Sequence, residues 1–268
     1  MSSLLALGVG VFGAALLCWG ISLWTGEVSW TDRLWAILPP IYVGYFWYTT
    51  GFSDARLWWM FALTTAWGLR LTYNLWRKGG FRPGEEDYRW ALVRARLTPA
   101  QFQWFNLLFI AGYQHLLLGL LALPAWQASK HHGAPLGAFD ALAMVAFTVF
   151  LFFEAAADQQ QWDFHQYKAA KQARGETVSP PFNTRGLWSI SRHPNFFFEQ
   201  AQWWTLYLFS VGSGAGWLNV SIIGPVLLTL LFDGSTRFTE KHSASKYPAY
   251  AEYQRTTPRW WPWPRPRA

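Results

Sequence analysis

Long apolar segments alternate along the chain with shorter segments rich in arginine, lysine and glycine. A helix crosses the hydrocarbon core of a bilayer with about 20 mostly apolar residues. The pattern therefore predicts an all-α fold, a polytopic integral membrane protein with one domain over residues 1–268. The predicted membrane-spanning helices are seven: 4–24, 34–50, 57–76, 102–126, 138–157, 194–211 and 217–232.

The cations predict how these helices are oriented. Arginine and lysine gather after the third span (77–96), after the fifth span (165–193) and in the tail (255–268). Seven spans place these three segments on the same side as the C-terminus. Segments rich in Lys and Arg remain in the cytoplasm. We therefore expect a multi-pass protein of the cell membrane, with its N-terminus outside and its C-terminus in the cytoplasm.

Composition favours the same class. Only 14% of the residues are charged and 20 are tryptophan, whereas soluble domains carry about 25% charged residues. The lone Cys18 allows neither an internal disulfide nor a cysteine-based zinc site, and we expect no metal. The stretch from Gly8 to Gly13 reads G-x-G-x-x-G, but it lies inside an apolar run. We interpret it as small residues that let a neighbouring helix pack closely, since a dinucleotide fingerprint needs a strand before it.

Polar and ionisable residues gather at the predicted cytoplasmic ends of the third, fifth and sixth spans. Such residues are costly inside a membrane and indicate a functional site. A purely structural alternative stays open, in which they only neutralise one another. Their shared depth and side favour a site for a large anionic ligand, because arginine grips phosphate with two parallel hydrogen bonds. These residues are Arg70, Asn74, Lys78, Asp158, Arg192, His193, Asn195 and Glu199.

Three tyrosines follow the seventh span. Tyr247, Tyr250 and Tyr253 lie in the stretch "KYPAYAEYQRTTPRWWPW". Their rings are suited to stack on an adenine nucleotide. The alternative is an aromatic belt at the membrane interface, where tyrosine and tryptophan are enriched.

The stretches "GLWSISRHPNFFFEQAQWW" and "KYPAYAEYQRTTPRWWPW" together resemble membrane-bound steroid 5-alpha-reductases and their bacterial relatives. The resemblance extends to the wider group with sterol C14-reductases and covers residues 187–262. It implies an enzyme that uses NADPH to reduce the enone C=C of a lipophilic substrate, such as a 3-oxo-Δ4 steroid. In EC terms this is an oxidoreductase acting on a CH–CH group.

The resemblance also implies roles for single residues. It places NADPH in the half of the chain from about 138 to 268, with assistance from the third span. The implied cofactor residues are Arg70, Asn74, Lys78, Asp158, Arg185, Arg192, His193, Asn195, Glu199, Tyr247, Tyr250 and Tyr253.

By position, Asp32 is the carboxylate of a carboxylate–tyrosine pair that polarises the substrate carbonyl. Desolvation at the membrane boundary is expected to raise its pKa. The tyrosine of the family falls near Trp67, where this chain has none. Tyr42, Tyr45 and Tyr73 are possible substitutes, and we assign Tyr45 and Tyr73 as candidates.

Two other functions stay open. Membrane methyltransferases of the isoprenylcysteine or phospholipid type use S-adenosylmethionine and carry a similar Arg-His-Pro motif, with Tyr where this chain has Phe. The basic loops favour NADPH over that cationic cofactor. A transporter or lipid-binding scaffold predicts polar residues on both sides of the midplane and repeat symmetry, and the sequence shows neither. We expect a monomer that contacts membrane lipid and binds no nucleic acid.

Overall fold

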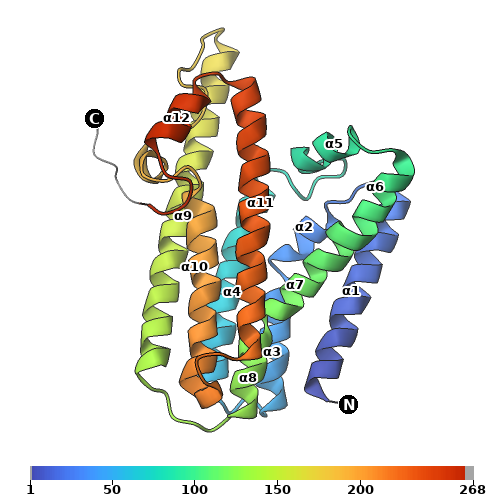
Figure 1. Cartoon of the computed structure of the whole chain (residues 1–268), viewed down its shortest axis with the longest axis vertical. Coiled ribbons are helices and arrows are strands. Elements are labelled where there is room, and N and C mark those ends of the chain that lie inside the picture. The colour runs from blue at the N-terminus through green and yellow to red at the C-terminus, as the bar shows by residue number, and fades with distance from the viewer. Residues whose placement is uncertain (1, 263–268) are drawn as a thin grey trace. The chain divides into compact units, whose positions relative to one another are not determined.

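The computed structural model describes residues 2–262, and these form helices joined by turns, with no strand among them (Figure 1). The all-α prediction is confirmed for this part of the chain. The basic tail is described only in part, since Trp263, Arg265 and Arg267 lie outside the described residues.

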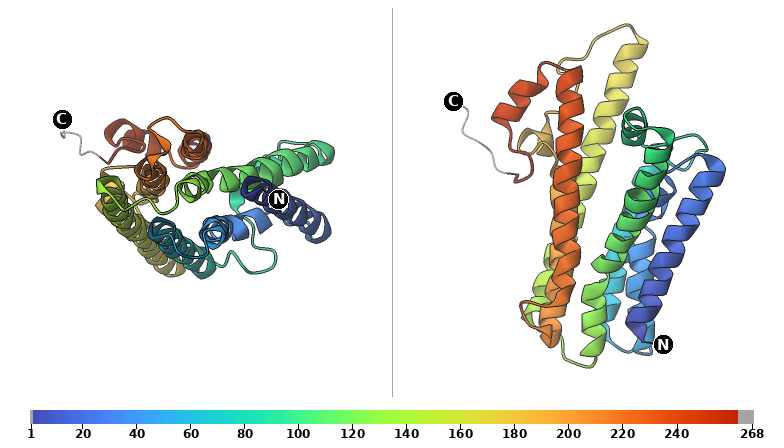
Figure 2. Two further views of the ribbon diagram at one scale, coloured as in Figure 1. Left: turned by 90° about the horizontal axis from the view of Figure 1, so that it is seen from below. Right: turned by 45° about the vertical axis from the view of Figure 1, so that its right-hand side comes forward.

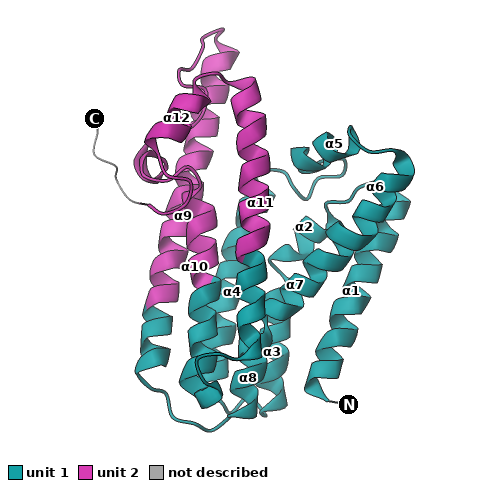
Figure 3. Cartoon of the chain, viewed as in Figure 1, with its two compact units in different colours: residues 1–145, 203–228 teal, residues 146–202, 229–268 magenta. Residues whose placement is uncertain are grey.

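The chain divides into two compact units (Figure 3). Unit 1 comprises residues 1–145 and 203–228, and unit 2 comprises residues 146–202 and 229–268. Three helices, α9 (Ala138–Ala173), α10 (Pro194–Ser210) and α11 (Ile223–Lys246), each contribute residues to both units.

Most of unit 1 comes from the first half of the chain. In this unit α1 packs along η1 and α7, which continue one another (Figure 2). Its elements are α1 (Ser3–Thr25), α2 (Trp30–Trp35), α3 (Leu38–Thr49), α4 (Ala55–Arg77), α5 (Tyr88–Arg94), α6 (Pro99–Phe105), the π-helix η1 (Asn106–Tyr113), α7 (Gln114–Leu121), α8 (Leu123–Lys130), η3 (Val211–Ala215) and η4 (Val220–Ile222).

The predicted helix over residues 34–50 is interrupted near its start. Helix α2 ends at Trp35 and α3 begins at Leu38, with Pro39 in its first turn. Proline lacks the N–H that a helix interior needs, but the first turn tolerates it because those N–H groups have no intrahelical partner. The proline pair therefore marks a helix start.

Four helical runs are long and apolar enough to span a membrane: Ser3–Thr25, Pro99–Lys130, Ala138–Ala173 and Val220–Lys246. They match the first, fourth, fifth and seventh predicted spans. Helices of this length and composition are compatible with a membrane protein. The other three predicted spans correspond to α3, α4 and α10. Helices α3 and α10 have only 12 and 17 residues, and α4 carries several arginines. The count of seven and the orientation therefore stay predictions.

A buried ion pair ties together three parts of unit 1. The guanidinium of Arg56, at the start of α4, donates to both carboxylate oxygens of Asp140 at 2.6 and 2.9 Å. It also donates to the carbonyl oxygens of Pro135 at 2.9 Å and Gly212 at 3.2 Å. Both charged side chains are fully buried. Because the remaining donors reach carbonyl oxygens, the arginine's burial is well compensated.

Unit 2 is built on the later parts of α9 and α11 and the first part of α10, with η2 (Gly186–Ser189) and α12 (Tyr250–Thr256). Aromatic rings pack between its helices. Phe198 lies 5.3 Å from Phe153, and Phe196 lies 4.6 Å from Phe232, measured between ring centroids. These contacts place the first turns of α10 against both neighbouring helices.

Candidate functional site

Arg192, just before α10, is held entirely by groups of unit 2. Its guanidinium donates to the two carboxylate oxygens of Glu240 on α11 at 2.7 and 3.0 Å. It also donates to the carbonyl oxygens of Gln254, at 2.9 Å, and Thr257. Arg192 and Glu240 are both buried. The guanidinium therefore fastens the end of α12 to α11 and to the start of α10, and its role as a phosphate ligand stays a prediction.

His193 joins the same cluster. Its Nε2 lies 3.0 Å from Oε1 of Glu240. Burial lowers the pKa of His193, and the hydrogen bond and charge of Glu240 oppose this without cancelling it. The imidazole is therefore neutral near pH 7 and donates its Nε2–H to the carboxylate. The backbone N–H groups of Arg192 and His193 donate to the carbonyls of Pro258 and Arg259 at 2.9 and 3.0 Å.

Two carboxylates of α9 bond amide groups of α10. Asp158 accepts a hydrogen bond from Nδ2 of Asn195 at 3.3 Å, and Glu154 accepts one from Nε2 of Gln202 at 2.7 Å. Both carboxylates are buried. Oδ1 of Asn195 is also buried and has no hydrogen-bond partner within the described part of the chain. Glu199 is half-buried one turn further along α10. The structure thus brings Asp158 and Asn195 together, as the sequence predicts.

The tail tyrosines pack around Phe182 within unit 2. The ring centroids of Tyr250 and Tyr253 lie 4.9 and 5.4 Å from that of Phe182, and both tyrosines are buried. Burial raises the pKa of Tyr253, whose hydroxyl donates to the carbonyl oxygen of Trp188. These contacts support the tail itself, and stacking on an adenine stays a prediction.

Tyr247 and Arg185 are more open. Nζ of Lys168 donates to the hydroxyl of Tyr247 at 3.3 Å. Burial opposes ionisation of this hydroxyl, but the hydrogen bonds and charges of Lys168 and Lys246 outweigh it and lower the pKa of Tyr247. The side chain of Arg185 is exposed.

In unit 1, Asp32 lies on α2 and accepts a hydrogen bond from Nε1 of Trp90 at 2.8 Å. Burial raises the pKa of Asp32, and the charge of Arg89 and the bond from Trp90 only partly oppose it. This is the direction expected from the sequence. The neutral carboxylic acid, which can donate a hydrogen bond, is thereby favoured.

The candidate tyrosines differ in burial. Tyr73 is 57% exposed, with its ring beside the guanidinium of Arg77, and Tyr45 is half-buried. Tyr42 is buried, and Trp67 is fully buried. Oη of Tyr42 and Nε1 of Trp67 have no hydrogen-bond partner among residues 2–262. Buried donors without partners suit a ligand's oxygen better than an exposed tyrosine does. The assignments of Tyr45 and Tyr73 stay untested predictions.

The remaining predicted residues lie at the end of α4. Asn74 is buried and accepts a hydrogen bond from Nε of Arg77 at 2.9 Å. Arg70 is half-buried, and Lys78 is exposed and attracted to Asp87. Their roles in binding a cofactor stay predictions.

The family described as "Protein of unknown function (DUF1295)" matches residues 18–257. The chain belongs to this family. An uncharacterized protein of Schizosaccharomyces pombe is 40% identical over 260 residues, which cover 91% of this chain and 75% of the yeast protein. No solved structure matches.

In this DUF1295 member, sequence reasoning missed the partner of the Arg-His pair. Glu240 lies beyond the predicted end of the seventh span at residue 232, whereas α11 continues to Lys246. The spacing of Asp233 and Arg237, four residues apart, is typical of a helix and could have indicated this extension. The resemblance draws attention to Tyr42 and to the position of Trp67, but their burial and the lack of partners for their donors among the described residues are visible only in the structure.

Proposed function

We propose that this DUF1295 protein is an NADPH-dependent reductase that reduces the enone C=C of a lipophilic substrate, such as a 3-oxo-Δ4 steroid. The observation that carries the proposal is the buried Oδ1 of Asn195, which lacks a donor while Nδ2 of the same side chain bonds Asp158. An unsatisfied buried amide oxygen is destabilising by about 1–3 kcal/mol. A ligand that brings an N–H to it removes this cost.

The residues of unit 2 fit such a cofactor. The carboxamide of a nicotinamide carries N–H groups that could donate to Oδ1 of Asn195, which no donor reaches in the described part of the chain. Arg185 is exposed. Arginine binds phosphate through parallel N–H donors. We infer that Arg192 supports the site and does not hold the phosphates, because its guanidinium already donates to Glu240 and to the carbonyl oxygen of Gln254.

When bound, NADPH supplies the hydride that adds to the β-carbon of the enone. As the hydride arrives, negative charge grows on the carbonyl oxygen of the substrate. A donor aimed at that oxygen is worth about 3 kcal/mol. Asp32 can serve once protonated, and its raised pKa favours this form.

Tyr42 and Trp67 of unit 1 also carry buried donors without partners among residues 2–262, and either could serve a substrate oxygen. The indole N–H of Trp67 can donate a hydrogen bond but keeps its proton. Asp32 and Tyr42 can also release a proton, which finally reaches the α-carbon. One hydride and one proton are then added across the double bond.

Binding of NADPH by Asn195→Ala tests the cofactor site. We expect about tenfold weaker binding by calorimetry in detergent, because removing one hydrogen bond in a buried site costs about 1.4 kcal/mol. Asn219→Ala is the control. This amide lies in the turn before η4 and bonds Oγ of Ser210, so its loss should leave NADPH affinity unchanged. Equal affinities of both variants and the unmodified protein would exclude Asn195 from the site.

Asp32→Ala tests the catalytic assignment. We expect turnover of a 3-oxo-Δ4 steroid to fall by about a hundredfold, the effect of losing one donor to the oxyanion, with NADPH binding retained. Parallel loss of binding and turnover would remove Asp32 from the catalytic role.

A melting screen separates the proposed cofactor from S-adenosylmethionine. A ligand at 100 times its dissociation constant stabilises the folded protein by about 2.7 kcal/mol. We expect NADPH to raise the melting temperature more than NADH does, and S-adenosylmethionine to leave it unchanged. A rise with S-adenosylmethionine alone would favour a methyltransferase instead.

A further inference from the structure

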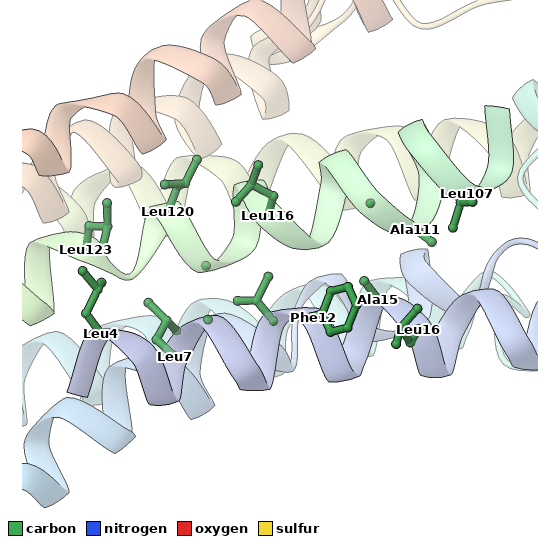
Figure 4. A pocket seen from close by; sticks show the side chains of 14 residues that line it. Leu4, Leu7, Phe12, Ala15, Leu16, Leu107, Ala111, Leu116, Leu120 and Leu123 are labelled. Carbon is green, nitrogen blue, oxygen red and sulfur yellow. The ribbon is translucent and has the colours of Figure 1, made fainter. Parts of the chain in front are cut away.

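An apolar groove of about 440 Å³ lies in unit 1 between α1 and the continuous run of η1 and α7 (Figure 4). Leu4, Phe12 and Leu16 line it from α1, and Leu107 and Leu116 line it from the opposite wall. All lining residues are leucine, valine, phenylalanine, alanine or glycine. No side chain in the groove can form a hydrogen bond or an ion pair, so its ligand must be apolar along its whole length.

Glycines determine where the walls touch and where they separate. A Cβ atom placed at Gly119 would lie 2.5 Å from Cγ2 of Val11, so the two helices are in close contact there. A Cβ atom at Gly8 would meet nothing within 4 Å. The sequence interpretation of close packing therefore does not apply at Gly8, the first glycine of the G-x-G-x-x-G stretch. The absence of a side chain at this position keeps the groove open.

Both walls come from candidate membrane spans, and only 11% of the apolar window of α1 is buried inside the protein. In a bilayer the remainder of α1 faces lipid chains. The groove extends from Leu4 to Leu16, about 18 Å along the helix. One leaflet of hydrocarbon is about 15 Å thick, half of the bilayer core. The groove therefore has the length of the chains in one leaflet.

The shape and lining of the groove indicate its occupant. The groove is elongated along α1, and the side chains on both walls are aliphatic or aromatic throughout. One extended hydrocarbon chain matches this length and needs no polar partner. An empty groove would lose the dispersion contacts that such a chain makes with both walls.

We propose that this groove binds one acyl chain of a membrane phospholipid, aligned along α1. The π-helix η1 supplies part of the wall through Leu107, Ala111 and Gly112, and such helices are frequent at functional sites. The bound chain remains longer than lipid on the convex faces of the protein, because two walls contact it. This proposal does not depend on the proposed reductase activity.

Photo-crosslinking of the full chain in phospholipid nanodiscs tests the proposal. A trace of phosphatidylcholine with a diazirine in the middle of one acyl chain serves as the probe, and labelled peptides are mapped by mass spectrometry. We expect more labelling at Leu116 and Leu120 than at the exposed Val145 and Val149 of α9. Equal labelling at the two places would show lipid that is only in general contact and would overturn the proposal.

Two matched glycine variants locate the chain. Gly8→Leu fills the groove, and we expect it to lower labelling of Leu116 and Leu120 about tenfold, equivalent to about 1.4 kcal/mol. Gly13→Leu adds the same side chain on the same helix at an exposed position that also has nothing within 4 Å, and it should leave labelling unchanged. Equal labelling of the two variants would overturn the proposal.

Further measurements cover the other outcomes. If Gly8→Leu does not fold, Ala15→Leu narrows the groove from the same helix and should give the same loss. Native mass spectrometry should show the protein carrying one phospholipid, and Gly8→Leu should lack it. A dimer of the unmodified chain that Gly8→Leu dissociates would show that a second copy covers the groove, and the proposal would be wrong.

Discussion

Replacing Glu240 with glutamine tests whether the buried cluster beside α10 holds unit 2 together. The carboxylate accepts two hydrogen bonds from Arg192, at 2.7 and 3.0 Å, and one each from His193 and Gln254 at 3.0 Å. Only 3% of Glu240 is exposed. Glutamine has nearly the same shape, so the substitution removes mainly the negative charge.

The expected cost follows from what remains. Arg192 is 7% exposed. Without the Glu240 carboxylate it is a buried cation that keeps hydrogen bonds to the neutral carbonyl oxygens of Gln254 and Thr257 but has lost the negative charge that paired with it. Removing one partner of a buried ion pair destabilises a protein by about 3–5 kcal/mol. Because glutamine retains one acceptor, we expect the lower limit, about 3 kcal/mol. For a chain of this size that corresponds to a melting temperature lower by about 6–12 °C.

The assay is thermal unfolding in detergent, followed by tryptophan fluorescence, with Asp233→Asn as the matched control. Asp233 lies on the same helix and pairs with Arg237 and Arg259 at 2.6 and 2.9 Å. It is 34% exposed, and partly exposed pairs contribute about 1 kcal/mol or less. If Glu240→Gln loses no more stability than Asp233→Asn, the buried cluster does not support the fold and our reasoning is wrong.

Three further predictions concern other parts of the chain. Asp140→Asn should lower the free energy of unfolding by about 3 kcal/mol, because it leaves Arg56 buried and charged; denaturant titration measures this, and a loss below 1 kcal/mol would contradict it. Gly68→Ala should destabilise by about 1–3 kcal/mol, since its methyl group would meet a backbone carbonyl oxygen at 2.4 Å, whereas Gly20→Ala, with nothing within 4 Å, should not; equal melting temperatures would refute the clash. The lowered pKa of His193 means that the unfolded state binds its proton more readily. The stabilisation that the neutral His193 side chain gives to the folded protein is therefore complete above the unfolded pKa of about 6.5, and it decreases as the pH falls below that value. The stability difference between the unmodified protein and His193→Gln should shrink on acidification to about pH 5, and a constant difference would refute the assignment.

The helical fold could be predicted because apolar runs of the right length have few other stable arrangements in lipid. The limits of the helices were harder to predict. Helix α9 continues sixteen residues past the predicted end at 157, to Ala173. The hydropathy of the sequence indicates only the part of a helix that can lie in the hydrocarbon core. The helix itself can continue beyond that part where its polar side chains form hydrogen bonds with one another. Gln159 bonds Asp163 and Gln161 bonds His165, each pair four residues apart.

The candidate site was predictable where its partners lie on consecutive spans. Asp158 and Asn195 were placed at adjacent ends of the fifth and sixth spans, and they form a hydrogen bond. The engagement of Arg192 could not be predicted, because Glu240 lies 48 residues further along the chain and no spacing rule connects them. Sequence position shows which residues share a helix face, but a partner on a third helix depends on packing between helices.

The hydrogen bonds that hold the Arg192 guanidinium have a consequence for biosynthesis. Its acceptors at Gln254 and Thr257 are translated 62 and 65 residues after it. While those residues are still inside the ribosome, the guanidinium has no carbonyl to bond on that side and an N–H at Arg192 still awaits Pro258. Assembly of this region is therefore delayed until the tail emerges. A nascent chain that stalls before Gln254 would display a poorly compensated cation beside α10, a feature by which cellular quality control can distinguish it from the finished protein.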